Sequence, residues 1–214
     1  MASFDTILFD VDGTLVDATS DIANAMNHAL RMLKLPELPK ETIVSYIGAG
    51  VKYLIRNSIG TDDDAIIEKG TKLYVDHYLA HAADETVLYP HVTDILEYLK
   101  GKRKFIFTNR YASFADVALR ALGVRNYFEA IIGGDDENCI KPSACSVDRI
   151  VKKFGIDKSK SLIVGDMDID VMTGKNSGIK TCWVTYGLGK IEEVGPLRPE
   201  YIIDDLIELK DIVK

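Results

Sequence analysis

The chain has 214 residues, enough for one domain with a good core or for a domain that carries a smaller inserted one. Its 47% hydrophobic and 28% charged residues are ordinary for a globular protein, and its net charge of −7 argues against nucleic-acid and anionic-membrane surfaces, which need basic patches. No apolar run reaches the roughly 18 residues of a membrane span, and the N-terminus "MASFDT" shows no signal-peptide pattern.

The three cysteines, Cys139, Cys145 and Cys182, are odd in number and fit neither a zinc spacing nor a redox pair. The simplest interpretation is a reduced, cytoplasmic compartment. The oligomeric state is not indicated by any pattern in the sequence.

The first predicted element is a buried strand at 6–9, and the chain that follows it is helical. Apolar residues recur at helical spacing over 22–33, a second helix is expected at 51–58 after "IGAG", and a third at about 62–80. No convincing strand falls within 18–86. We therefore expect a small all-helical insertion after the first strand, from which "VLYPHV" leads back to the sheet.

The rest of the chain alternates short strands with helices. Strands are predicted at 104–107, 161–164 and 180–184, with weaker candidates at 130–132 and 201–203. Helices are predicted, each with a glycine at its end, at 113–122, 143–154 and 169–177. This alternation predicts an α/β fold with a doubly wound, Rossmann-like parallel sheet. The expected domains are a core of 1–16 and 88–214 and a helical cap of 17–87.

Polar residues follow three of the strands at the point where each strand ends, in "FDVDGT", "FTNR" and "VGDMDID". The carboxyl ends of parallel strands meet at one edge of a sheet, where ligands bind. We therefore expect one group of side chains to converge there: Asp10, Asp12, Thr108, Asn109, Asp166 and Asp170, with Lys141 reaching the same edge from a loop.

Four carboxylates at one edge would raise one another's pKa unless a cation neutralised them. Carboxylates without nearby histidines or thiolates suit a hard cation, and Mg²⁺ is the commonest such ion at phosphate sites. A cation, a lysine and a threonine hydroxyl form a cradle for a phosphoryl group. An aspartate can attack phosphorus, and a neighbouring aspartate can transfer the proton.

In this order, "DVDGT", "TN", "KP" and "GDMDID" resemble the four motifs of the haloacid dehalogenase superfamily of phosphatases. The resemblance covers essentially the whole chain, and the helical insertion is similar to that family's small helical cap. It implies that Asp10 is the nucleophile and a metal ligand. It also implies that Asp12 is the general acid/base and gives the metal its backbone carbonyl.

The later motifs carry the other roles that the resemblance implies. Thr108 and Lys141 would hold the transferring phosphate, helped by the backbone at Asn109. Asp166 would bind Mg²⁺, and Asp170 would support the metal site without binding the ion itself.

Within the superfamily the chain is most similar to phosphoglycolate phosphatases, through "IGAG" at 47–50, "WVTYGLG" at 183–189 and "PEYIIDDLIEL" after it. The implied substrate is a small phosphorylated metabolite, phosphoglycolate or a similar phosphomonoester. The chain departs from the family pattern at three positions. Met167 stands where serine or threonine is usual, Ala144 where a second proline is usual, and His91 where glycine is common. None of them removes a predicted catalytic group.

Other functions stay open at this point. A mutase similar to β-phosphoglucomutase shares the aspartyl phosphate, but Val51 and Lys52 stand near the position of that branch's arginine–glutamate pair. Phosphatases for nucleotides, sugar phosphates or pyrophosphate are alternatives. A signalling receiver is much shorter and lacks "DGT", and a catalytically dead binding protein would lack a catalytic group.

Within the predicted cap, four residues are candidates to face the substrate: Gly48, Gly50, Lys52 and Arg56. The two cations could meet a substrate carboxylate, although a solvated face suits them equally well.

Two histidines, His77 and His81, are four apart on the third predicted helix. That spacing can bind zinc, but no third ligand is apparent, and the surface of the cap is the preferred interpretation.

Overall fold

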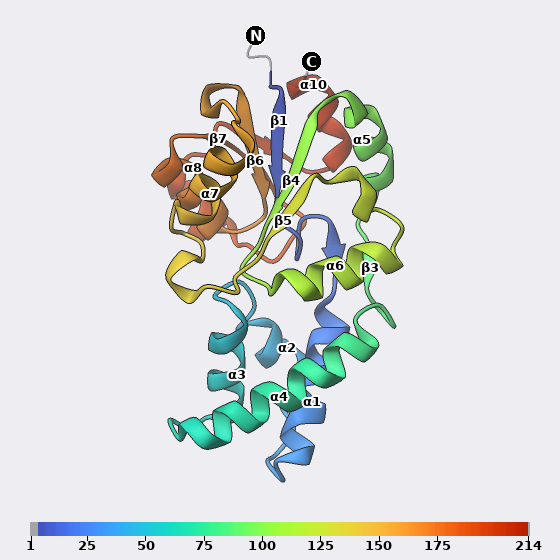
Figure 1. Ribbon diagram of the computed structural model, residues 1–214, viewed down its shortest axis with the longest axis vertical. Helices are drawn as coiled ribbons and strands as arrows, with labels where there is room; N and C mark the ends of the chain where they lie inside the picture. The colour runs from blue at the N-terminus through green and yellow to red at the C-terminus, as the bar shows by residue number, and fades with distance from the viewer. Residues whose placement is uncertain (1–3, 214) are drawn as a thin grey trace.

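A six-stranded parallel sheet forms the centre of the computed structural model, which describes residues 4–213 (Figure 1). The strand order is β5–β4–β1–β6–β7–β8. The strands are β1 (Thr6–Phe9), β4 (Arg103–Phe107), β5 (Ala130–Ile132), β6 (Ser161–Gly165), β7 (Lys180–Val184) and β8 (Tyr201–Ile203). The predicted doubly wound α/β fold is confirmed, and strand order reverses between β1 and β6, where such sheets bind ligands.

Helices cover both faces of the sheet, which explains why its strands read as continuous apolar runs. On one face, Leu8, Phe105 and Ile163 pack against α7 (Cys145–Phe154). Strand residues that point to the opposite face, such as Ile7, belong to a larger apolar cluster. On that face they pack with α5 (Val92–Tyr98), α6 (Ala112–Ala121) and α10 (Leu209–Ile212). Two further helices, α8 (Asp168–Ser177) and α9 (Ile191–Val194), cover β7 through Val171, Trp183 and Val194.

Short 3₁₀ helices connect these elements at Leu99–Gly101, Arg125–Tyr127, Glu137–Cys139, Lys158–Lys160, Gly195–Leu197 and Leu206–Glu208.

Four helices within residues 19–81 form the helical insertion, which lies beyond the carboxyl ends of the strands (Figure 1). They are α1 (Thr19–Met32), α2 (Lys40–Val44), α3 (Val51–Ile59) and α4 (Asp64–His81). Helices α1 and α4 pack along each other. The start of α4 is capped by Asp63, whose Oδ1 accepts the Ala65 N–H at 2.9 Å.

Two short strands, β2 (Val16–Asp17) and β3 (Val87–Leu88), pair antiparallel where the chain enters and leaves the helical insertion. Two-residue strands carry no alternation that periodicity can detect. The sequence analysis also missed α2, which begins directly after Pro39, and α5, which follows His91 in a left-handed conformation with φ of 59°.

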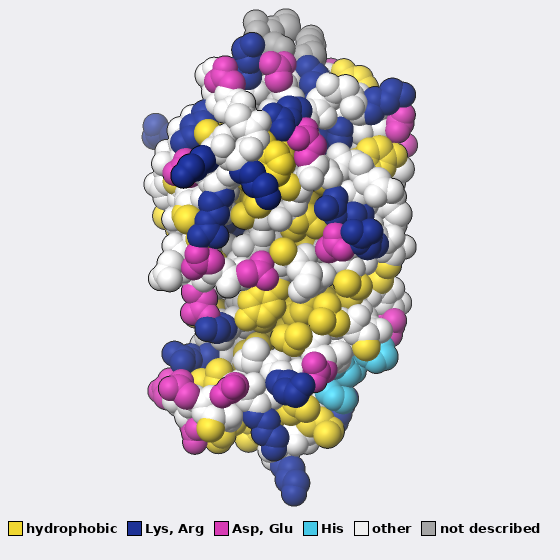
Figure 2. Space-filling model, in the orientation of Figure 1, with side chains coloured by type: hydrophobic (Ala, Val, Ile, Leu, Met, Phe, Trp, Pro, Cys, Tyr) yellow, Lys and Arg dark blue, Asp and Glu magenta, His cyan; other side chains and the backbone are white. Residues whose placement is uncertain are grey.

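Histidine side chains gather at the surface of the helical insertion (Figure 2). The ring centroids of His28 and His77 are 4.1 Å apart, and those of His77 and His81 are 4.4 Å apart. The rings pack against one another at tilts of 34° and 30°. Among residues 4–213, the three side chains whose ligand atoms lie close enough together to hold a metal ion are aspartates outside the helical insertion. In that same part of the chain, every helix is too short or too polar to cross a membrane.

Candidate active site

Asp10 and Asp12 lie in the loop that follows β1, at the predicted edge of the sheet. The Asp10 N–H donates to the Val164 carbonyl at 2.9 Å, so the loop begins as an extension of the strand. The Val16 N–H then donates to the Val11 carbonyl at 3.0 Å, which folds the chain back toward β2. Both carboxylates line one cavity at this edge.

Gly13 and Thr14, which follow Asp12, position Asp166 at the carboxyl end of β6. Gly13 has φ of +79°, and a Cβ at this position would collide with the Asp166 carboxylate. Thr14 donates its hydroxyl hydrogen to Asp166 Oδ1 at 3.0 Å, and the Leu188 N–H donates to Oδ2 at 2.7 Å. The missing side chain of Gly13 therefore leaves room for the Asp166 carboxylate, and Thr14 orients that carboxylate.

Asp10, Asp166 and Asp170 form a buried acidic cluster in which one carboxylate oxygen from each lies within 4.8 Å of the others. Oxygen ligands at this spacing fit a hard divalent cation. The Asp12 carboxylate lies outside the cluster, and the resemblance assigns only its backbone carbonyl to the metal. Both oxygens of Asp170 already accept hydrogen bonds, from the Lys141 ammonium and from the Met167 N–H, which suits a supporting role.

Lys141 is the cation that partly neutralises this cluster. Its Nζ lies 2.7 Å from Asp10 Oδ1 and 2.7 Å from Asp170 Oδ1, and its side chain is only 2% exposed. The contact with Asp10 is an ion pair rather than an aligned hydrogen bond, because Oδ1 has no hydrogen-bond partner of good geometry. Burial lowers the pKa of Lys141, but the two carboxylates outweigh it and hold that pKa above its usual range.

Without a metal ion, we expect the free energy of unfolding to fall as the pH rises from about 4 to 8. Burial raises the pKa of Asp10 from 3.8 to about 7, against the opposing effect of Lys141 and with a contribution from Asp170. The protonated form therefore contributes stability below pH 4 that is lost as the pH passes 7, by at most about 4 kcal/mol.

Urea unfolding in EDTA at several pH values measures this dependence. Mg²⁺ should restore more stability at pH 8 than at pH 5, and Asp10→Asn should flatten the curve. A wild-type curve that does not change with pH in EDTA would contradict the argument.

The loop after β4 supplies Thr108 and Asn109, both buried. Asn109 joins two parts of the structure through its side chain. Its Nδ2 donates to the carbonyls of Gly48 at 2.8 Å and Lys141 at 3.1 Å, and its Oδ1 accepts the Lys141 N–H at 2.6 Å. One amide therefore holds the lysine loop and a backbone carbonyl of the helical insertion together.

The cavity has a polar floor and an apolar roof. The core side contributes the predicted residues Asp10, Asp12, Thr108, Asn109 and Lys141. The helical insertion contributes Ile22, Ile47, Gly48, Gly50, Val51, Leu54 and Tyr74. The cavity volume is about 40 Å³, which favours a small ligand.

Of the four candidates in the predicted cap, the two glycines line the cavity and the two cations do not. Gly48 and Gly50 line the cavity, and a Cβ at Gly48 would collide with the sulfur of Met167. Lys52 is ion-paired with Glu137 and lines a neighbouring pocket of about 240 Å³. Arg56 lies outside both, exposed and 3.5 Å from Asp64. The structure therefore does not bring Arg56 to the site.

A charged residue of the cavity wall, Arg110, was not a candidate in the sequence. Arg110 follows Asn109 in "FTNR", and its guanidinium lies 3.3 Å from the Asp12 carboxylate. Its position directly after the second motif was the only available signal, because an arginine after a strand is most often exposed.

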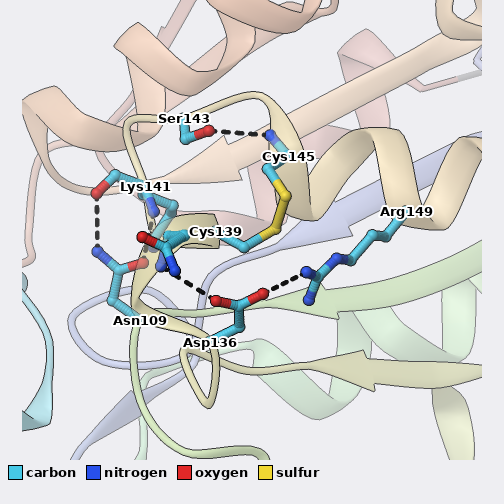
Figure 3. Close-up of a disulfide and its surroundings, with 8 residues drawn as sticks. Asn109, Asp136, Cys139, Lys141, Ser143, Cys145 and Arg149 are labelled. Carbon is cyan, nitrogen blue, oxygen red and sulfur yellow. Dashed lines mark hydrogen bonds and ion pairs between the residues drawn. A yellow bond between two sulfur atoms is a disulfide. The ribbon is translucent and has the colours of Figure 1, made fainter.

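Cys139 and Cys145 form a disulfide, although the cysteine spacing fits neither a zinc site nor a redox pair (Figure 3). The six-residue separation matches no familiar redox motif, but the loop turns back and brings the two Cα atoms to 5.1 Å. The reduced compartment inferred from unpaired cysteines loses its support. Figure 3 shows Lys141 inside the loop that this bond closes, next to Asn109.

Replacing both cysteines, as Cys139→Ser with Cys145→Ser, should lower the free energy of unfolding by about 2 kcal/mol, as expected for a loop this short. Loosening of the Lys141 loop should also raise KM. Thermal unfolding and steady-state kinetics with and without dithiothreitol measure both effects. Reductant should lower the stability of the wild type to that of the double variant and should not change the stability of the double variant. Equal response of both proteins to reductant would contradict the prediction.

Comparison with known proteins relates this geometry to a family. The model of the haloacid dehalogenase-like hydrolases matches residues 7–184. The chain is 34% identical to the phosphoglycolate phosphatase of Aquifex aeolicus over 207 residues, covering 96% of each chain. It is 33% identical to that of Pseudomonas putida, covering 94% of this chain and 76% of the relative. A crystal structure of a predicted phosphoglycolate phosphatase from Haemophilus somnus superposes with a TM-score of 0.92 at 26% identity, covering 99% of both chains.

Proposed function

Because the chain belongs to the haloacid dehalogenase-like hydrolases and is a phosphoric monoester hydrolase, we propose that it hydrolyses phosphoglycolate or a closely similar phosphomonoester. We propose that the reaction depends on Mg²⁺ and passes through an aspartyl phosphate. The observation that carries the proposal is the buried cluster of Asp10, Asp166 and Asp170, which Lys141 contacts, beside a small cavity that Asp10 and Lys141 line.

Asp10 and Asp166 would hold the metal ion with the backbone carbonyl of Asp12. The fit rests on the buried acidic cluster, which a single lysine neutralises only in part. Burial and the neighbouring Asp170 and Asp10 raise the pKa of Asp166 well above its usual range, so the cluster favours a cation. When bound, Mg²⁺ supplies charge neutralisation for the phosphoryl oxygens.

In the first half of the reaction, an Asp10 carboxylate oxygen attacks phosphorus and the bond between phosphorus and the ester oxygen breaks. Asp12 gives its proton to the departing oxygen. In the second half, a water oxygen attacks the phosphorus of the aspartyl phosphate while Asp12 takes a proton from that water. The bond between phosphorus and the Asp10 oxygen breaks, which frees inorganic phosphate and restores the Asp10 carboxylate, and Asp12 is protonated again.

Thr108 and Lys141 would hold the oxygens of the transferring phosphoryl group, close to the Asp10 carboxylate. The helical insertion would act as a cap, with residues 17–87 moving against the core at β2 and β3. Its apolar roof would exclude bulk water from the aspartyl phosphate until the leaving group departs.

The names of the relatives and the small volume of the cavity support phosphoglycolate over nucleotides. A metabolite substrate also supports a cytoplasmic location, which no longer draws on the cysteines.

Phosphate release measured over phosphoglycolate, sugar phosphates, nucleotides and pyrophosphate, with Mg²⁺ and with EDTA, tests the proposal. We expect activity only with Mg²⁺ and the highest kcat/KM for phosphoglycolate. Comparable turnover of many unrelated esters would contradict the proposal that phosphoglycolate is the preferred substrate. Isomer formation from a hexose 1-phosphate without phosphate release would favour a mutase.

A further inference from the structure

Arg110 places a buried guanidinium in the wall of the cavity, where the proposed reaction has no use for it. The Arg110 side chain is 4% exposed, and arginine is almost never this buried without a partner. It lies between the core and the helical insertion. Its Nη2 donates to the Tyr78 hydroxyl of α4, and its Cζ lies 4.9 Å from the centre of the Tyr78 ring. Tyr78 is itself fully buried against Phe114. The guanidinium is therefore held firmly from one side.

The other side of the guanidinium is incompletely satisfied. Nη1 lies 3.3 Å from Asp12 Oδ1, but neither atom has a hydrogen bond of good geometry among the described residues. A buried donor without a hydrogen-bond acceptor destabilises a protein, and most strongly when the donor is charged. An anion in the cavity would give Nη1 its missing acceptor.

The position of Arg110 relative to the reacting groups indicates which anion it meets. Lys141 contacts Asp10, the proposed nucleophile, so that end of the cavity takes the phosphoryl group. Arg110 contacts Asp12, the proposed donor of a proton to the leaving oxygen, so it lies at the leaving-group end. The roof above is apolar and offers no competing cation among the residues that line the cavity.

We propose that Arg110 binds a carboxylate of the leaving group and makes the enzyme selective for phosphomonoesters that carry one close to the ester oxygen. The inference rests on the proposed function, since glycolate is such a leaving group. The planar guanidinium matches a carboxylate better than an ammonium does, and such charge-assisted bonds are among the strongest hydrogen bonds in proteins. Tyr78 is a positioning residue that orients the guanidinium.

Two substrates separate this role from a structural one. Phosphoglycolate and ethyl phosphate have leaving groups of equal carbon number, and only the first carries a carboxylate. Their ratio of kcat/KM, measured for wild type, Arg110→Lys, Arg110→Met and Tyr78→Phe, is the readout. We expect Arg110→Met to lower the preference for phosphoglycolate on the order of 100-fold, mainly through KM. Arg110→Lys and Tyr78→Phe should lower it less.

Binding gives a second measurement that does not depend on turnover. Calorimetry in the Asp10→Asn background should show that adding Arg110→Met lowers the affinity for phosphoglycolate much more than the affinity for ethyl phosphate. If the affinity for both substrates falls equally, Arg110 supports Asp12 or the fold, and the inference is wrong. A preference that survives in Arg110→Lys and Arg110→Met also overturns it. If instead the wild type hydrolyses both esters equally well, the proposed substrate fails, whatever the variants do.

Discussion

Replacing Asp10 with asparagine is expected to lower kcat for phosphate release by on the order of 10⁴-fold or more. An amide cannot take the place of a carboxylate as the attacking group, and it also removes one negative charge from the acidic cluster with Asp166 and Asp170. Wild-type enzyme that is acid-quenched during turnover should carry a phosphoryl group on the peptide containing Asp10, and the variant should carry none.

The matched control is Asp168→Asn, two residues from Asp166 in the first turn of α8 and outside the acidic cluster. Its loss of charge near a helix N-terminus should cost stability by only about 0.3–1 kcal/mol, with kcat close to that of the wild type. If Asp10→Asn keeps turnover within about tenfold of wild type, and mass spectrometry shows an intact amide, Asp10 is not the nucleophile.

Replacing Lys141 with methionine should damage both stability and activity. The ammonium is the shared partner of Asp10 and Asp170, and its removal leaves buried carboxylates uncompensated, at about 3–5 kcal/mol. The carboxylates respond by holding protons, so their folded pKa values rise. The loss of stability is therefore smaller at pH 5 and larger at pH 8. Loss of the phosphate contact should lower kcat/KM by on the order of 10²-fold or more.

Urea unfolding at the two pH values, with and without Mg²⁺, measures the stability effect. Lys100→Met is the control, because the Lys100 side chain is 74% exposed and solvent screens its ion pair with Glu97, so its removal should change stability little at either pH. An Lys141→Met penalty of the same size at pH 5 and pH 8 would mean that Lys141 does not stabilise the carboxylates through charge.

The strands could be predicted because a parallel sheet covered on both faces favours short continuous runs of apolar residues. Strands β1, β5, β7 and β8 have the predicted bounds, β4 begins one residue earlier and β6 ends one residue later. Strands β2 and β3 were missed because two residues are too few to show a period. Helix α5 was missed because it has only seven residues and follows the left-handed His91 directly.

The convergence of the acidic residues could also be predicted, because the carboxyl ends of parallel strands share an edge whatever their separation in sequence. The contact of Arg110 with Tyr78 could not, because it joins a core loop to a helix of the insertion and no periodicity relates the two. The same holds for the stacking of His28 on His77. The Cys139–Cys145 bond depends on the path of a loop, which spacing does not determine.

The hydrogen bond from Asn109 to the helical insertion ends on the carbonyl of Gly48, a group that every amino acid possesses. The roof of the cavity, in contrast, consists of side chains such as Ile22, Leu54 and Tyr74. Substitutions in the roof can therefore alter the shape and polarity offered to a leaving group without deleting an atom of this attachment. The attachment and the roof therefore consist of different atoms, and point mutations in the roof leave the hydrogen bond from Asn109 and the polar residues beneath it in place.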